Sequence, residues 1–192
     1  MTPGGGPTAA APVLTSVAPG RGSTEGGLPL NIDGTGFSST VTLTIGGVVA
    51  YSGSIHGSTF FLTASPPGIA GPADAVLTNA DGQSSTLKNA FTFVPPASLE
   101  VNGDWQGWTA WNAEFALDFT IQNNALVSAS CGGSANLVST PVPVAGNGSF
   151  SVTSNGMTMS GKIAGEGYWR GQTGGPSFCS GDGPWIAMRR VR

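Results

Sequence analysis

Residues 30–37 have the sequence Leu-Asn-Ile-Asp-Gly-Thr-Gly-Phe, and this stretch decides the fold of the first half of the chain. Leu30 and Ile32 alternate with polar residues, so an extended strand places both side chains on one face. Gly34 and Gly36 then fit a bend in which the backbone takes a positive φ or approaches another segment closely. Phe37 follows, and we expect its ring to close one end of a β-sandwich. The stretch therefore predicts a half-buried strand that ends in a glycine-dependent bend.

Similar short strands flank this stretch and are separated by turn residues. The pair Gly46-Gly47 fits a two-residue hairpin turn, and residues 79–82 (Asn-Ala-Asp-Gly) form another turn. About seven strands in roughly 85 residues, each with one apolar face, are typical of a β-sandwich. The predicted strands cover residues 12–17, 28–33, 41–45, 48–51, 60–64, 75–78 and 87–94.

Several glycine, proline and aromatic landmarks follow one another in a fixed order. They are Val17-Ala18-Pro19, Gly26-Gly27, residues 30–37, Ile45-Gly46-Gly47, Ser65-Pro66-Pro67, Gly71, residues 79–82 and Phe91-Thr92-Phe93. This order resembles the IPT/TIG domain, an immunoglobulin-like fold, and we assign such a domain to residues 12–95. Members of the family occur in cell-surface receptors, in some transcription factors and in bacterial surface and carbohydrate-active proteins. The resemblance brings no catalytic residues, and it implies a binding module.

The composition excludes several classes of protein. Charged residues make up 9% of the 192 residues and the net charge is −3, so the straight-chain residues that long helices need at their surface are scarce. An all-β fold is therefore expected. Seven basic residues cannot form a phosphate-binding stripe, and we expect no nucleic-acid partner. The first domain has only two basic residues, Arg21 and Lys88. The DNA-binding members of the IPT/TIG family need basic loops, so this version of the domain is disfavoured. No apolar run approaches the roughly 20 residues of a membrane span.

The use of aromatic residues changes after residue 94. All five tryptophans and both cysteines follow Pro95-Pro96-Ala97-Ser98, a stiff junction at which we place a domain boundary at about residue 96. Residues 97–192 are predicted to be a small antiparallel β-sandwich or barrel. Its predicted strands cover residues 113–121, 125–130, 149–152, 157–163 and 184–189.

Residues 1–11 are rich in Gly, Pro and Ala, and we interpret them as a flexible tether. They lack the basic and apolar regions of a signal peptide, which leaves two interpretations. The protein is cytosolic, or the chain begins after a removed export signal. Residues 1–11 also resemble the tether that follows the lipid-bearing cysteine of bacterial surface lipoproteins. That cysteine is absent from this chain, and a lipid anchor is a further interpretation.

Cys131 and Cys179 both lie in the second half and are predicted to form one disulfide. Closing a loop of about 49 residues stabilises a fold by roughly 4 kcal/mol in the chain-entropy model. Two unrelated buried thiols are the alternative. A disulfide favours an oxidising compartment, and we expect an extracellular or cell-surface protein.

The tryptophans are the main candidates for a binding site. Trp105, Trp108 and Trp111 recur every three residues, and the glycine and threonine between them favour a strand followed by a loop. Many proteins bind sugars by stacking exposed planar rings on them, whereas buried tryptophans contribute apolar surface to the core. We expect Trp105 and Trp185 in the core, and we take Trp108, Trp111 and Trp169 as candidates for exposure.

A second candidate is the segment Tyr168-Trp169-Arg170, which lies between two glycines. An aromatic pair beside an arginine in a glycine-rich segment is typical of a binding loop. An ordinary strand with one buried residue is the alternative, and it is slightly favoured.

Catalytic and metal sites find little support. Glu114 and Asp118 share a strand face, but four residues along a strand span about 13 Å, beyond the roughly 5–9 Å that glycosidase carboxylates need. His56 is the sole histidine and lies in a Gly/Ser-rich loop without a nucleophile motif. We expect no catalytic residue, no metal and no cofactor.

These observations favour a non-catalytic extracellular module for binding or adhesion. The favoured partner is a glycan, bound through the Trp-rich second domain, or another surface protein. The alternative is a structural subunit of an extracellular assembly that associates with itself. A hydrolase accessory domain ranks third.

Overall fold

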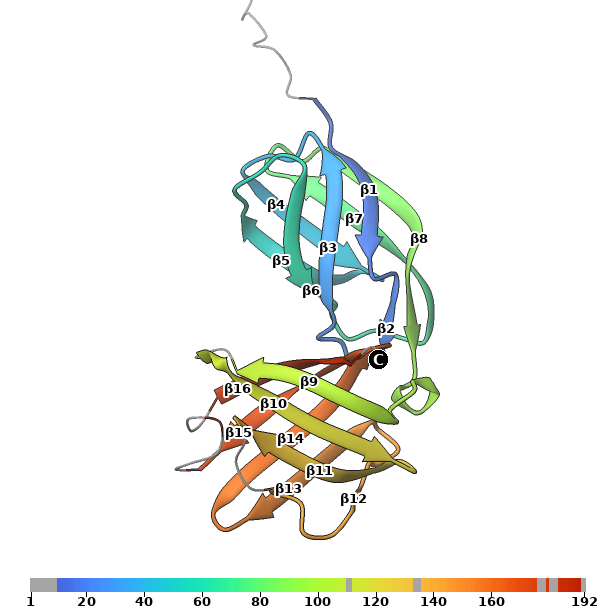
Figure 1. Ribbon diagram of the computed structural model, residues 1–192. Coiled ribbons are helices and arrows are strands. Elements are labelled where there is room, and N and C mark those ends of the chain that lie inside the picture. Colours follow the sequence, from blue (N-terminus) through green and yellow to red (C-terminus); the bar gives the residue numbers. More distant parts are fainter. Residues whose placement is uncertain (1–9, 110–111, 133–135, 176–178, 180–182, 191–192) are drawn as a thin grey trace, which may run out of the picture. The chain divides into compact units, whose positions relative to one another are not determined.

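The computed structural model describes residues 10–109, 112–132, 136–175, 179 and 183–190 (Figure 1). These residues form β-strands and one short 3-10 helix, η1 (Pro96–Ser98), and no helix among them could cross a membrane. The all-β class is thus confirmed. The chain divides into two compact units, one up to Phe93 and one from Val94 onward. The boundary expected at about residue 96 lies close to this division, and independent folding of the two units stays a prediction.

The first domain is a sandwich of two sheets, which confirms the predicted immunoglobulin-like fold. One sheet has the order β1-β3-β6 and the other the order β2-β8-β7-β4-β5 (Figure 1). The strands are β1 (Val13–Ala18), β2 (Arg21–Ser23), β3 (Pro29–Thr35), β4 (Thr40–Ile45), β5 (Val48–Ser54), β6 (Phe60–Ala64), β7 (Gly71–Asn79) and β8 (Ser84–Val94). Alternate residues of each sheet, such as Leu30, Ile32, Leu43 and Leu77, are buried in the core.

Gly34 and Gly36 shape the bend at the end of β3. Gly34 lies so close to β1 that a Cβ atom would overlap the carbonyl oxygen of Val13 and the ring of Phe37. Gly36 has a φ of +69°, and a Cβ atom there would lie 2.9 Å from the carbonyl oxygen of Ala11. The bend therefore needs glycine for two different reasons, close approach at the first position and positive φ at the second.

Phe37 and Asn79 fix the loop after the bend. The buried ring of Phe37 meets Phe61 edge-on, with ring centroids 5.9 Å apart. The side-chain amide of Asn79 donates a hydrogen bond to the carbonyl oxygen of Gly36 (2.8 Å), and its Oδ1 accepts one from the N–H of Ser38 (3.0 Å). Because Asn79 ends β7, this side chain ties the bend to the opposite sheet.

We predict that Gly36→Val destabilises the first domain by more than about 1 kcal/mol, because a β-branched residue is strained at positive φ. Gly57→Val is the matched control, since Gly57 has no positive φ and its Cβ would make only ordinary contact. Denaturant unfolding of both variants measures the difference. Equal stability of the two variants would contradict the role of Gly36.

The second domain is a single antiparallel sheet of eight strands in the order β12-β11-β10-β9-β16-β15-β14-β13. Its strands are β9 (Gly103–Thr109), β10 (Asn112–Gln122), β11 (Ala125–Cys131), β12 (Val142–Pro143), β13 (Ser149–Ser154), β14 (Met157–Gly165), β15 (Tyr168–Gly174) and β16 (Gly183–Arg189). β9 pairs with both β10 and β16, so the first and last strands of the domain are neighbours. A turn joins β12 to β13 and is closed by a hydrogen bond from the N–H of Ala145 to the carbonyl oxygen of Ser149 (2.8 Å). The sheet therefore curls like an up-and-down barrel that is open between β12 and β13.

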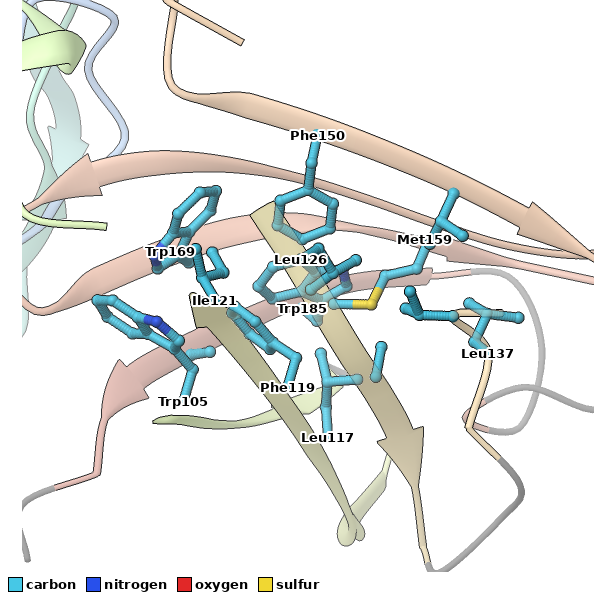
Figure 2. Packing of buried hydrophobic residues seen from close by; sticks show 14 of the residues in the cluster. Trp105, Leu117, Phe119, Ile121, Leu126, Leu137, Phe150, Met159, Trp169 and Trp185 are labelled. Carbon is cyan, nitrogen blue, oxygen red and sulfur yellow. The ribbon is translucent and has the colours of Figure 1, made fainter. Parts of the chain in front are cut away.

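Five aromatic rings fill the inside of this curled sheet, each from a different strand (Figure 2). They belong to Trp105, Phe119, Phe150, Trp169 and Trp185. Ring centroids are 5.2 Å apart between Phe150 and Trp169, and 5.5 Å apart between Phe119 and Trp185. The interior is thus a packed aromatic core, and a ligand has to bind outside it.

The burial of the tryptophans confirms one expectation and corrects another. Trp105 and Trp185 are 1% and 3% exposed, as predicted for core residues. Trp169 is completely buried, so its predicted exposure is wrong. The segment Tyr168-Trp169-Arg170 is an ordinary strand with one buried residue, the slightly favoured interpretation, and not a binding loop, because β15 pairs along its length with β14 and β16. Strand alternation then turns Trp169 inward, whereas Tyr168 and Arg170 face outward.

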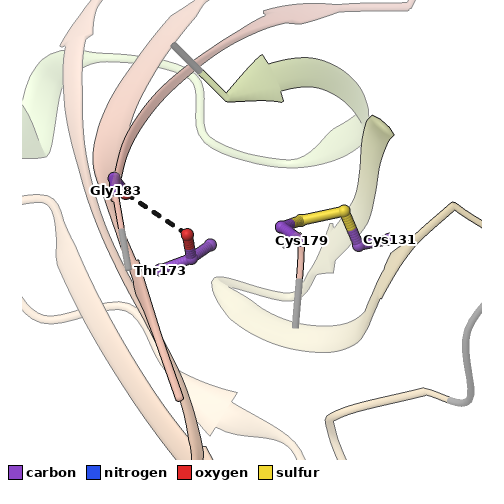
Figure 3. Close-up of a disulfide and its surroundings, with 4 residues drawn as sticks. All are labelled: Cys131, Thr173, Cys179 and Gly183. Atoms are coloured by element: carbon purple, nitrogen blue, oxygen red, sulfur yellow. Dashed lines mark hydrogen bonds between the residues drawn. A yellow bond between two sulfur atoms is a disulfide. The ribbon is translucent and has the colours of Figure 1, made fainter. Parts of the chain in front are cut away.

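The predicted disulfide between Cys131 and Cys179 is confirmed (Figure 3). It joins the end of β11 to the segment between β15 and β16, with the two Cα atoms 5.4 Å apart. In the same region the hydroxyl of Thr173 donates a hydrogen bond to the carbonyl oxygen of Gly183 (3.2 Å). The bond closes a span of 48 positions that contains β12 to β15.

We predict that the double change Cys131→Ser, Cys179→Ser lowers the free energy of unfolding by about 4 kcal/mol. Without the disulfide, the unfolded chain regains the conformational entropy that the closed loop had removed. Chemical unfolding of the oxidised wild type and the double variant measures this difference. Intact mass with and without reductant provides the control, since the oxidised protein lacks the two thiol hydrogens. Two thiols that alkylate freely in the native protein would contradict the prediction.

Candidate functional site

Strand register collects one row of side chains on the outer face of the second domain. Trp108 on β9 lies opposite Ile186 on β16, and Ile186 lies opposite Arg170 on β15. The row continues on β14 with Lys162, which lies opposite Arg170, and ends with Ser149 on β13. We call these five residues the Trp108 row. They point away from the aromatic core because their strand neighbours point into it.

A second row of outward-facing residues lies two positions away from the Trp108 row on each of β13 to β16. Gln172 lies opposite Pro184 on one side and opposite Ser160 on the other, and Ser160 lies opposite Ser151. We call these four residues the Gln172 row. Neighbouring strands in a sheet are about 5 Å apart, so the two rows form one continuous outer surface. This surface is polar on β13 to β15 and apolar on β16, where Ile186 and Pro184 lie.

Between the two outer rows runs an inner row that contains two glycines. Phe150 lies opposite Gly161, Gly161 opposite Gly171, and Gly171 opposite Trp185. A Cβ atom at Gly161 would lie 2.6 Å from the ring of Phe150 and 2.9 Å from that of Trp185. A Cβ atom at Gly171 would overlap the indole of Trp185 and a backbone oxygen of β14. The two large rings therefore occupy the space that side chains at the glycines would need.

An open groove of about 560 Å³ lies over these glycines on β13 to β16. Its polar lining comes from both outer rows, and the inner-row residues Phe150 and Trp185 border it although both are buried. Such volumes are typical of small-ligand sites, which range over about 300–1,000 Å³. The polar residues of this groove are Ser149, Ser151, Ser160, Lys162, Arg170 and Gln172.

We predict that Gly171→Ala destabilises the second domain by about 1–3 kcal/mol, since an added methyl group overpacks the site against the indole of Trp185. Gly146→Ala is the matched control in the same domain, because a Cβ atom there meets no atom within 4 Å. Thermal and denaturant unfolding of both variants measure the effect. A Gly171→Ala variant as stable as the Gly146→Ala variant would contradict the packing of the inner row.

The structure brings together only part of the predicted site. Trp108 is 41% exposed, Arg170 is exposed and Tyr168 is half-buried, and all three lie on the outer face. Trp169 lies in the core, as described above, and Trp111 lies outside the described residues. The two Trp residues of β9 face opposite sides because they are three positions apart in a strand.

Lys162 is a groove residue that the sequence analysis missed. The signal was present in the alternation of β14, where Met159, Gly161 and Ile163 face the core and the residues between them face outward. The pairing of Lys162 with Arg170 depends on strand register, which the sequence alone did not provide.

The other described basic residues of this domain are engaged away from the groove. Arg189 donates to the carbonyl oxygen of Asn102 (2.6 Å), and its guanidinium lies 5.2 Å from the ring centre of Trp105. Arg190 forms an exposed ion pair with Asp118 (2.7 Å). These contacts attach the end of β16 and the residue after it to the beginning of the domain.

Acidic residues in the described part of the chain form no metal site. No group of three or more His, Cys, Asp or Glu residues is close enough there to hold an ion. Asp81 accepts hydrogen bonds from the side chain and backbone of Gln83, which lower the pKa of its carboxyl group. A hydrogen bond from Lys88 likewise lowers the pKa of Asp74. Both carboxylates therefore stabilise local turn and strand contacts.

The two-sheet sandwich with its glycine bend and its Asn79 clamp has a counterpart among known families. Residues 12–93 match the family model of the IPT/TIG domain. The first domain is an IPT/TIG domain. Such domains are immunoglobulin-like modules, typically non-catalytic, and often part of surface or binding proteins. The match covers less than half of the chain, and the second domain lies outside it. No curated protein matches the chain.

The TIG domain carries its own exposed apolar surface on β5 and β6. Both strands lie at the ends of their sheets. The side chains of Val48, Val49, Phe60 and Leu62 are 41%, 56%, 47% and 63% exposed, and we call these four residues the apolar edge. A groove of about 490 Å³ beside them is lined by His56 among others, which places the sole histidine at this surface.

Proposed function

We propose that the chain is a non-catalytic extracellular binding module whose second domain binds a carbohydrate on its outer face. The observation that carries this proposal is the exposure of Trp108 on the same face as Tyr168 and the groove. Exposed tryptophan rings supply large apolar contact area together with a polar N–H group. The flat C–H face of a sugar ring can stack on such a ring.

The polar part of this face suits the hydroxyl groups of a sugar. Serine hydroxyls both donate and accept hydrogen bonds, and the Gln172 side chain offers two donors and an acceptor. The aromatic core leaves the ligand no route into the sheet, so binding across β9, β16, β15 and β14 is the arrangement that the fold supports. A long, shallow face of this kind suits an extended oligosaccharide.

Two further features support an extracellular setting. A structural disulfide persists in oxidising compartments. The TIG domain belongs to a class of modules that often occur in surface or binding proteins. A glycan or another surface protein is therefore the partner that we propose.

We predict that Trp108→Ala abolishes binding on a glycan array while leaving the melting temperature nearly unchanged, because the ring is 41% exposed. Trp169→Ala is the matched control, since this buried ring belongs to the core. Core aromatic truncation costs about 3–5 kcal/mol, so this variant should lose stability. A Trp108→Ala variant that binds glycans like the wild type would contradict the proposed function.

The apolar edge of the TIG domain supports a second candidate, a structural subunit that associates through a second copy of the same edge. Two edge strands with exposed apolar side chains form a template for strand-to-strand association. In this alternative the second copy covers Phe60 and Leu62.

We predict that a self-associating chain becomes monomeric in the Leu62→Lys variant, because a charge on the edge opposes pairing. Light scattering over a concentration series measures the mass, and Thr86→Lys on β8 serves as an exposed control that lies off this edge. A wild-type chain that stays monomeric at every concentration excludes the assembly alternative.

A further inference from the structure

The strand β13 ends the sheet of the second domain and has β14 as its neighbour on one side. Just before β13, the N–H of Ile163 donates to the carbonyl oxygen of Gly148 (2.9 Å). Because hydrogen-bonded pairs alternate along an antiparallel ladder, every second residue after Gly148 bonds to β14. The residues between them, Ser149, Ser151 and Thr153, therefore direct their backbone N–H and carbonyl groups away from β14.

A local turn uses these outward backbone groups at Ser149. Its carbonyl oxygen accepts a hydrogen bond from the N–H of Ala145 (2.8 Å), and its N–H donates to Oδ1 of Asn147 (3.2 Å). Among the described residues, no group bonds to the outward backbone groups of Ser151 and Thr153. Both residues are exposed, so β13 presents unpaired donors and acceptors along an open edge.

The edge of β13 also lacks the features with which edge strands usually resist pairing, which are charged side chains, proline and bulges. Its sequence is Ser-Phe-Ser-Val-Thr-Ser, and its register with β14 is regular over all six residues. The other described sheet-end strands of six or more residues are β1 and β5, and an extra residue interrupts the register of each, Thr15 and Ala50. Among these strands, β13 is therefore the one best suited to accept a further strand.

A second copy of β13 fits this edge in one antiparallel register. When the two-fold axis lies at Val152, Ser151 of each copy lies opposite Thr153 of the other copy. Each of these pairs exchanges two N–H···O hydrogen bonds, which uses all the open backbone groups of both copies. The two Val152 residues then form the closer, non-hydrogen-bonded pair between them.

The side chains match in the same register. Serine opposite threonine is a favourable cross-strand pair, because the two hydroxyl groups can bond to each other. The β-branched side chain of Val152 lies opposite its own copy on the inner face. No charged residue occurs on β13, so the pairing opposes no like charges. This self-complementarity favours a second copy over a strand of another protein, which would have to supply the same pattern.

We propose that two copies of this chain pair through β13 and join their second domains in one continuous antiparallel sheet. This surface differs from the apolar edge of the TIG domain. The two-fold axis stands perpendicular to the paired strands, so the outer faces of both copies lie on the same side of the sheet. If the proposed carbohydrate function holds, the dimer presents two binding faces together and gains affinity through bivalent attachment.

The test measures the mass of the full chain by light scattering over a concentration series. We expect the mass of the wild type to double as the concentration rises. Thr153→Pro removes one open N–H group and leaves the hydrogen bonds to β14 in place, so this variant should stay monomeric. Leu62→Lys changes the apolar edge and should dimerise like the wild type.

Two variants with changes at the same positions test the register. The variant Ser151→Lys, Thr153→Lys places lysine opposite lysine in the dimer, and like charges at such positions destabilise a strand pair. The variant Ser151→Lys, Thr153→Glu places opposite charges there instead. We expect the first variant to be monomeric and the second to dimerise. Thermal unfolding of each variant shows that the fold is intact.

Several results would overturn the inference. A wild type that stays monomeric at every concentration rejects it, and so does a dimer that persists in both Thr153→Pro and the double lysine variant. Loss of the dimer in Leu62→Lys alone assigns the association to the apolar edge. Monomers in both charged variants reject the register centred on Val152. None of these results decides whether the monomer binds a glycan, which the glycan array tests separately.

Discussion

The packing of five aromatic rings inside one curled sheet is the constraint on which the second domain depends. Because the interior is filled, every other residue of β9 and β13 to β16 has to face outward. The same alternation that buries Trp105 and Trp169 therefore exposes Trp108 and places Arg170 at the groove. Core and candidate site are two faces of one sheet.

Glycine makes this close packing possible in both domains. Gly34 leaves room for the ring of Phe37, and Gly161 and Gly171 leave room for the ring of Trp185. This use explains part of the high glycine content, 31 of 192 residues, which in other proteins indicates flexible loops. The groove lies on the outer side of the sheet at Gly161 and Gly171, between the outward-facing rows.

The sequence predicted the fold better than the site, and the reason is physical. Alternating strands and turn glycines are short-range patterns in the sequence, and their order matched that of the TIG domain. The two cysteines predicted the disulfide. The burial of Trp169 and the pairing of Lys162 with Arg170 depend on which strands pair and in what register, which a local pattern does not encode. The short strands β2 and β12 escaped prediction because three and two residues hold no periodicity.

The most direct test of the account is to locate the ligand on the folded chain by nuclear magnetic resonance. A titration with an oligosaccharide that binds on the glycan array should shift the indole N–H signal of Trp108 and the backbone amide signals of Lys162, Arg170 and Gln172. The indole signal of Trp105, which donates to the carbonyl oxygen of Val101 in the core, should stay in place. Shifts confined to the TIG domain, or no shifts at all, would contradict a carbohydrate site on the outer face of the second domain.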